Sequence, residues 1–151
     1  MATAYPDLAV VGHFSIDTLN LPTRTAPFII LGGAVTYTSL AAKNLDAKTQ
    51  IISRVGEHFP QAYLWWLEQE DVNVAAVTRH PDEDTTGFEL TYTKNFSDRT
   101  LKLKTKGHTL TLQDIPRDLY AKAVHLGPIA NEIPIEVACE LKKHCEVLSL
   151  D

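Results

Sequence analysis

Short apolar runs alternate with helical patterns along the first half of the chain. Three runs are typical of strands buried on both faces in a parallel sheet: residues 8–11, 50–56 and 72–77. Between them, residues 34–45 carry small and apolar side chains on one helical face, and residues 60–70 begin with a proline that suits a first helical turn. This alternation of strands and helices predicts an α/β domain.

The middle of the chain departs from this alternation. Residues 86–93 and 100–106 are β-rich, and the polar segment 94–99 between them predicts a hairpin. Lys102, Lys104 and Lys106 alternate with other residues in the second run, so one of its faces is solvated. Alternating lysines either attract an anionic partner or protect an exposed edge strand, and the second interpretation is favoured.

Helices and strands alternate again after Gly107. The pattern predicts a short helix from Asp114 to about Ala121, a strand over 123–127, a helix over 133–144 and a strand over 146–151. A parallel sheet that ends on a strand has one poorly covered side. The chain is therefore expected to be part of a longer protein, or to have a partner that covers this strand.

Composition narrows the functional classes. The chain has 151 residues, the size of one domain, and its net charge of -5 disfavours nucleic-acid binding. No apolar run is long enough to span a membrane, and no secretory signal is present, so a cytoplasmic location is expected. The two cysteines exclude a disulfide scaffold, and the cysteine and histidine spacing does not favour a zinc site.

Two features offer candidate chemistry. Asp17 lies just past the first strand, where open α/β sheets bind ligands. Its carboxylate either accepts hydrogen bonds from two sugar hydroxyls at once or caps a nearby turn. Gly32-Gly33 precedes the first helix, so it forms either a ligand-binding helix N-terminus or a simple strand-to-helix turn. No phosphate loop and no nucleophile elbow occur.

Seven short pieces, taken in order, resemble the ribokinase-like (PfkB) carbohydrate kinase family. They are Val10-Val11-Gly12 with Asp17, Gly32-Gly33-Ala34, Ser53-Arg54-Val55-Gly56, Asp71-Val72-Asn73, Thr86-Gly87, the segment 110–116, and Val124-His125-Leu126-Gly127. The resemblance covers nearly the whole chain but only the first half of the family pattern. It implies an incomplete, Rossmann-type three-layer α/β sandwich with a small β-sheet lid from about 17–31 and 85–106.

The resemblance also implies site residues. Asp17 is similar to the family's hydroxyl-binding aspartate, Ser15 stands where ribokinases carry an asparagine, and Gly32 and Gly33 match the glycine pair beside the sugar. Phe88 is a candidate apolar contact from the lid.

The chain departs from the family pattern at three further positions. Tyr37, assigned to the substrate site, replaces the family's usual asparagine, and His58 and Gln61 replace its usual aspartate and glycine. The Gly-Gly-x-x-Thr-Tyr form, with Gly127-Pro128-Ile129, looks more like the inositol-kinase-like branch.

The family's catalytic Gly-Ala-Gly-Asp stretch has no match in this sequence. The resemblance therefore implies the substrate-binding, N-terminal part of an ATP-dependent sugar or polyol kinase. ATP and Mg²⁺ would bind through a C-terminal half, no residue of this chain is assigned to catalysis or metal binding, and the isolated chain is expected to be inactive. The alternatives are a nucleoside kinase of the same fold, or a non-catalytic domain that binds a ligand or forms a homodimer through the lid.

Overall fold

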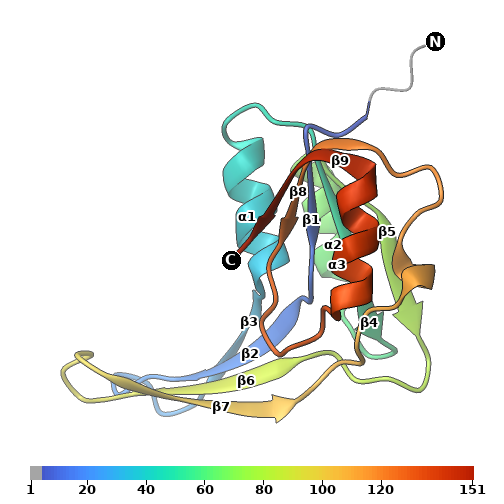
Figure 1. Cartoon of the computed structure of the whole chain (residues 1–151). Coiled ribbons are helices and arrows are strands. Elements are labelled where there is room, and N and C mark those ends of the chain that lie inside the picture. Colours follow the sequence, from blue (N-terminus) through green and yellow to red (C-terminus); the bar gives the residue numbers. More distant parts are fainter. Residues whose placement is uncertain (1–4) are drawn as a thin grey trace.

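The computed structural model describes residues 5–151, and its larger sheet has five parallel strands (Figure 1). In spatial order they are β5 (Val72–His80), β4 (Thr49–Gly56), β1 (Leu8–Val11), β8 (Ala121–Leu126) and β9 (Cys145–Leu150). The chain segment that follows β1 therefore leaves the sheet from an interior position. This position matters because ligands of open α/β sheets bind beyond the carboxyl ends of the strands.

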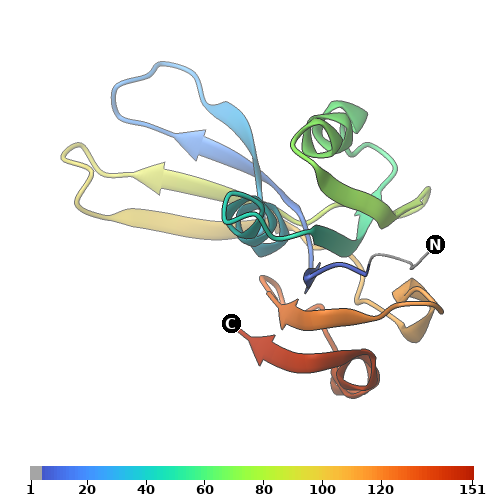
Figure 2. The same ribbon diagram turned by 90° about the horizontal axis from the view of Figure 1, so that it is seen from above.

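Helices cover both faces of this sheet (Figure 2). One side carries α1 (Ala34–Lys43) and α2 (Gln61–Gln69), and the other carries α3 (Ile135–Leu141), which continues as the 3-10 turn η2 (Lys142–His144). The side chains of β1 alternate between the two cores: Val10 packs in the core under α1 and α2, whereas Ala9 and Val11 pack in the core under α3.

A second sheet of four strands projects away from these layers (Figure 1). Its order is β3 (Phe28–Gly32), β2 (Ser15–Asn20), β6 (Gly87–Tyr92) and β7 (Arg99–Thr105). The β6–β7 pair is an antiparallel hairpin, and β7 is exposed along its whole length as an edge strand, as its lysines predict. The predicted α/β three-layer fold with a separate small sheet is confirmed.

The predicted helix from Asp114 to Ala121 is wrong. Asp114 does not begin a helix but is the last residue of a 3-10 turn, η1 (Leu112–Asp114). The Asp114 carboxylate accepts hydrogen bonds from the backbone N–H and the hydroxyl of Thr111, at 2.7 and 2.9 Å, so it closes a capping box. The following Pro116 disfavours helical geometry at Ile115, which is extended with φ -83° and ψ 119°.

Candidate functional site

The predicted site residues gather where β1 gives way to the second sheet. A pocket of about 350 Å³ is lined by Ser15, Asp17, Gly33, Ala34, Tyr37, Phe88, Leu101 and Ile129. Five of these eight were predicted from the sequence, and the sixth predicted residue, Gly32, lies directly behind Asp17. The volume is in the range of small-molecule sites. That these residues bind a substrate stays a prediction.

Asp17 is the charged group of this pocket. Burial raises the pKa of its carboxyl above the usual range, while hydrogen bonding from the Ser15 hydroxyl and the Phe88 backbone acts in the opposite direction. Among the described residues, Oδ1 of Asp17 has no hydrogen-bond partner although it is buried. An unpaired buried carboxylate oxygen is unfavourable, so this side chain would gain stability from a hydrogen-bond donor.

The two glycines let the backbone pass close to this carboxylate. Gly32 pairs with Ser15 across the β2–β3 ladder, and a Cβ at Gly32 would overlap Oδ2 of Asp17 and lie 2.5 Å from Oγ of Ser15. Gly33 has φ +92°, a conformation that other residues rarely adopt. The glycine pair is therefore required by the site's geometry and is more than a flexible turn.

The N-terminus of α1 opens on the same pocket. Gly33 is the N-cap and offers no side chain to the first-turn amides, and the first turn holds no acidic residue. Ala34, the first helical residue, lines the pocket. The helix therefore places partial positive charge close to the Asp17 carboxylate, an arrangement suited to a ligand with oxygen atoms.

The remaining walls are apolar and aromatic. Phe88 comes from β6 and Leu101 from β7, so both belong to the projecting sheet, whereas Ile129 follows β8. Tyr37 is 57% exposed, and its hydroxyl donates a hydrogen bond to the carbonyl of Leu31 at 3.3 Å. A ligand here would contact polar groups on one side of the pocket and partly apolar side chains on the other.

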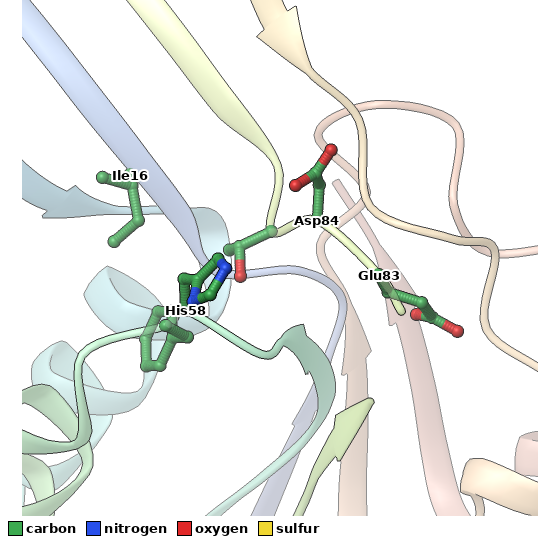
Figure 3. A pocket seen from close by; sticks show the side chains of 6 residues that line it. Ile16, His58, Glu83 and Asp84 are labelled. Carbon is green, nitrogen blue, oxygen red and sulfur yellow. The ribbon is translucent and has the colours of Figure 1, made fainter. Parts of the chain in front are cut away.

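A second, smaller pocket of about 160 Å³ lies at the joint between the sheets, lined by Ile16, His58, Phe59, Glu83, Asp84 and Thr85. Ile16 and Asp17 are adjacent in β2, so the two pockets lie on opposite faces of that strand. Figure 3 shows the Glu83 and Asp84 side chains directed away from each other and from His58. These labelled groups therefore do not converge on one ligand position.

Sequence reasoning missed two buried charged residues near the site. Glu132 is fully buried, and its carboxylate accepts hydrogen bonds from the backbone N–H groups of His13, Ile129 and Ala130 at 2.8–3.1 Å. Arg54 lies in β4 with a side chain only 10% exposed. An arginine in a mostly buried strand is a sequence signal for a buried ion pair.

Cofactor-binding residues are not evident in the described part. Within residues 5–151, no three His, Cys, Asp or Glu side chains lie close enough to hold a metal ion. Over the same range, no helix is both long enough and apolar enough to cross a bilayer.

Comparison with known proteins points to one fold. No protein-family model matches the chain. It is 29% identical over 143 residues to the cytidine kinase of Thermococcus kodakarensis, and this match covers 90% of the chain and 48% of that kinase.

Two solved structures are similar over nearly the whole chain. One is a pyrophosphate-dependent kinase in the ribokinase family, with a TM-score of 0.80 and 23% identity over 95% of this chain and 49% of that one. The other is the nucleoside kinase of Methanocaldococcus jannaschii, an archaeal member of the ribokinase family. Its TM-score is 0.75, with 19% identity over 96% of this chain and 52% of that one. The predicted resemblance is thus confirmed: the chain has the fold of the ribokinase family, and it spans about half the length of the relatives that it matches.

Proposed function

We propose that this chain is the acceptor-binding part of a kinase that transfers a phosphoryl group to a hydroxyl of a sugar, inositol or related polyol. The observation that carries the proposal is the half-buried Asp17 carboxylate, which has one unpaired oxygen and shares its pocket with the N-terminus of α1. Such a carboxylate binds and orients a hydroxylated ligand. The kinase relatives support phosphoryl transfer as the reaction of the whole protein.

The residues of this chain would act by positioning. Asp17 and Ser15 would hold acceptor hydroxyls, and the first-turn amides of α1 would lie beside the acceptor's oxygen atoms. Phe88 and Leu101 would cover the acceptor and exclude water from it. Holding two reactants in a productive geometry is a large part of phosphoryl-transfer catalysis.

The donor site is assigned to residues outside this chain. The donor would be ATP with Mg²⁺, which supply the phosphoryl group and neutralise its developing charge. Pyrophosphate is a second donor to test, because one of the structural relatives is pyrophosphate-dependent. Cytoplasmic location and a homodimer through the small sheet remain predictions of the sequence.

A nucleoside acceptor is a second candidate, favoured by the aromatic and apolar lining of the pocket. A nucleoside presents ribose hydroxyls at one end and a flat base at the other. The hydroxyls would bind Asp17, and the base would pack against the aromatic residues Tyr37 and Phe88 of the lining. The similarity to a cytidine kinase supports this candidate.

A panel assay separates these candidates. The complete protein is incubated with ATP or pyrophosphate and with myo-inositol, ribose, fructose, cytidine or adenosine, and phosphorylated product is measured. Product from a polyol or sugar supports the first candidate, and product from a nucleoside supports the second. No product with any pair, together with ligand-induced thermal stabilisation, would refute a kinase and favour the non-catalytic ligand-binding alternative.

A further inference from the structure

The β6–β7 hairpin is held by the parallel pairing of β6 with β2 and joins the core through two chain connections. Residues 81–86 lead from β5 into the hairpin, and residues 106–111 lead out of it toward η1. Because Phe88 and Leu101 line the candidate pocket, the angle of the hairpin sets the shape of that pocket. The contacts that fix these two connections are therefore positioning elements for the site.

Arg54 reaches both connections from the core strand β4. Its Nε donates a hydrogen bond to Oε2 of Glu83 at 3.1 Å, and its Nη2 donates one to Oε1. The guanidinium therefore binds the entering connection through two parallel hydrogen bonds. Its Nη1 donates to Oδ2 of Asp114 at 3.1 Å and to the carbonyl of Thr109 at 3.5 Å on the leaving side. One buried side chain thereby ties the entering and leaving segments to the sheet.

The three charged groups of this cluster are shielded from water. The side chains of Arg54, Glu83 and Asp114 are 10%, 11% and 5% exposed. Two histidines border them: His80 Nδ1 lies 3.2 Å from Nη2 of Arg54, and His108 Nδ1 lies 3.4 Å from Oε1 of Glu83. Removing the guanidinium would leave two shielded carboxylates with no full counter-charge, so the connections would separate.

A second tie runs from the adjacent core strand. His13, which follows β1 and is almost fully buried, has its Nδ1 2.9 Å from the hydroxyl oxygen of Thr86 on the entering side. The same oxygen accepts a hydrogen bond at 3.0 Å from the backbone N–H of Gly107 on the leaving side. Because this tie remains in an Arg54 variant, the hairpin should loosen while the core stays folded.

We propose that Arg54 is a positioning residue that fixes the β6–β7 hairpin over the candidate pocket by clamping both of its connections. The clamp itself follows from the contacts, and only its importance for acceptor binding rests on the proposed function. The charge alone is not what matters: the role needs a planar group that reaches Glu83 and Asp114 at once.

The position of the hairpin can be measured without any ligand. In the complete protein, the native cysteines are replaced by serine, and one cysteine is introduced at Asn95 in the hairpin turn and another at the exposed Glu68 on α2. A spin label is attached to each introduced cysteine. Pulsed electron spin resonance then gives the distribution of distances between the labels. Arg54→Gln should broaden this distribution at least about twofold, and Arg54→Lys should give an intermediate width because one ammonium cannot hold both carboxylates.

Arg79→Gln is the matched control. Arg79 makes several hydrogen bonds at the same end of the sheet, to the carbonyls of Gly56 and Glu57 and to Gln61, but none to either hairpin connection. Its substitution should leave the distribution unchanged. A distribution for Arg54→Gln as narrow as that of the wild type would overturn the proposal. If Arg54→Gln fails to fold, Glu83→Gln replaces it, and an unchanged distribution in that variant would overturn the proposal equally.

A kinetic readout connects the clamp to the site. With an acceptor that the panel identifies, Arg54→Gln should raise KM by about tenfold and change kcat less than twofold, because Arg54 does not touch the pocket. If Arg54→Gln and the control Arg79→Gln raised KM equally, the role of Arg54 would be a general structural one and the proposal would be contradicted. Absence of any kinase activity would refute the proposed function and leave the distance measurement as the test of the clamp.

Discussion

Replacing Asp17 by asparagine should separate ligand binding from stability. The variant keeps the size of the side chain and one acceptor oxygen but removes the charge. A hydrogen bond to a charged group contributes about 1.5–3 kcal/mol, so the KM for the acceptor should rise about 10- to 150-fold. If the second oxygen also holds a hydroxyl, as its unpaired state indicates, the effect should lie at the upper end of this range.

The same change should stabilise the unliganded protein at neutral pH. Burial raises the pKa of the Asp17 carboxyl above its ordinary value, so the folded state binds this proton more tightly than the unfolded state does. The unfolding free energy of the wild type therefore falls as the pH rises from about 4 through the raised pKa. Asparagine has no such titration, so we expect the variant to be more stable than the wild type at pH 7.

Two measurements check this reasoning. Steady-state kinetics of the complete protein gives KM and kcat, and urea unfolding at pH 4 and pH 7 gives the free energy of unfolding. Asp118→Asn serves as control, since Asp118 is exposed and lines a different pocket, near the amino ends of the strands. The reasoning is refuted if Asp17→Asn leaves KM unchanged, and its electrostatic part fails if the variant is less stable than the wild type at pH 7.

Three further outcomes are expected. Gly32→Ala should displace the Asp17 carboxylate, lower the unfolding free energy by about 1–3 kcal/mol and raise the acceptor KM; an unchanged KM would contradict the close packing of these residues. Glu132→Gln should lower the unfolding free energy by about 2 kcal/mol in urea titrations, since three backbone N–H groups lose a charged acceptor; an unchanged midpoint would show that the charge is dispensable. The isolated 151-residue chain should transfer no phosphoryl group from ATP or pyrophosphate to any acceptor of the panel, and robust turnover by its monomer would refute its assignment as part of a kinase.

The sequence predicted the elements well because most of them obey local rules. The strand at Leu8–Val11 is uniformly apolar because helices cover both faces of the sheet, and the hairpin has a polar turn between two β-rich runs. Local rules failed at Asp114. Its carboxylate caps η1 and also pairs with Arg54, and the second role depends on a residue 60 positions away.

The candidate site was partly predictable for the same reason. Asp17 lies in β2, shortly after the end of β1, and Gly32-Gly33 joins the end of β3 to α1, so their neighbourhood follows from the general behaviour of α/β sheets. Leu101 could also be expected among the apolar residues that cover a ligand, because it belongs to the β-rich run 100–106; the hairpin sets it opposite Leu90. The partners of Arg54 and Glu132, in contrast, depend on topology, since they are drawn from distant segments.

The interior position of β1 has a consequence for synthesis of the chain. Its neighbour β4 ends at Gly56, but its other neighbour β8 begins only at Ala121, and α3 follows later still. While the ribosome adds those residues, at about 5–20 per second, Ala9, Val11 and Ile52 have no covering helix for several seconds. The nascent chain therefore presents an apolar sheet face with an open strand edge during translation, and slow translation of the segment after β5 would extend its exposure to aggregation and to chaperones.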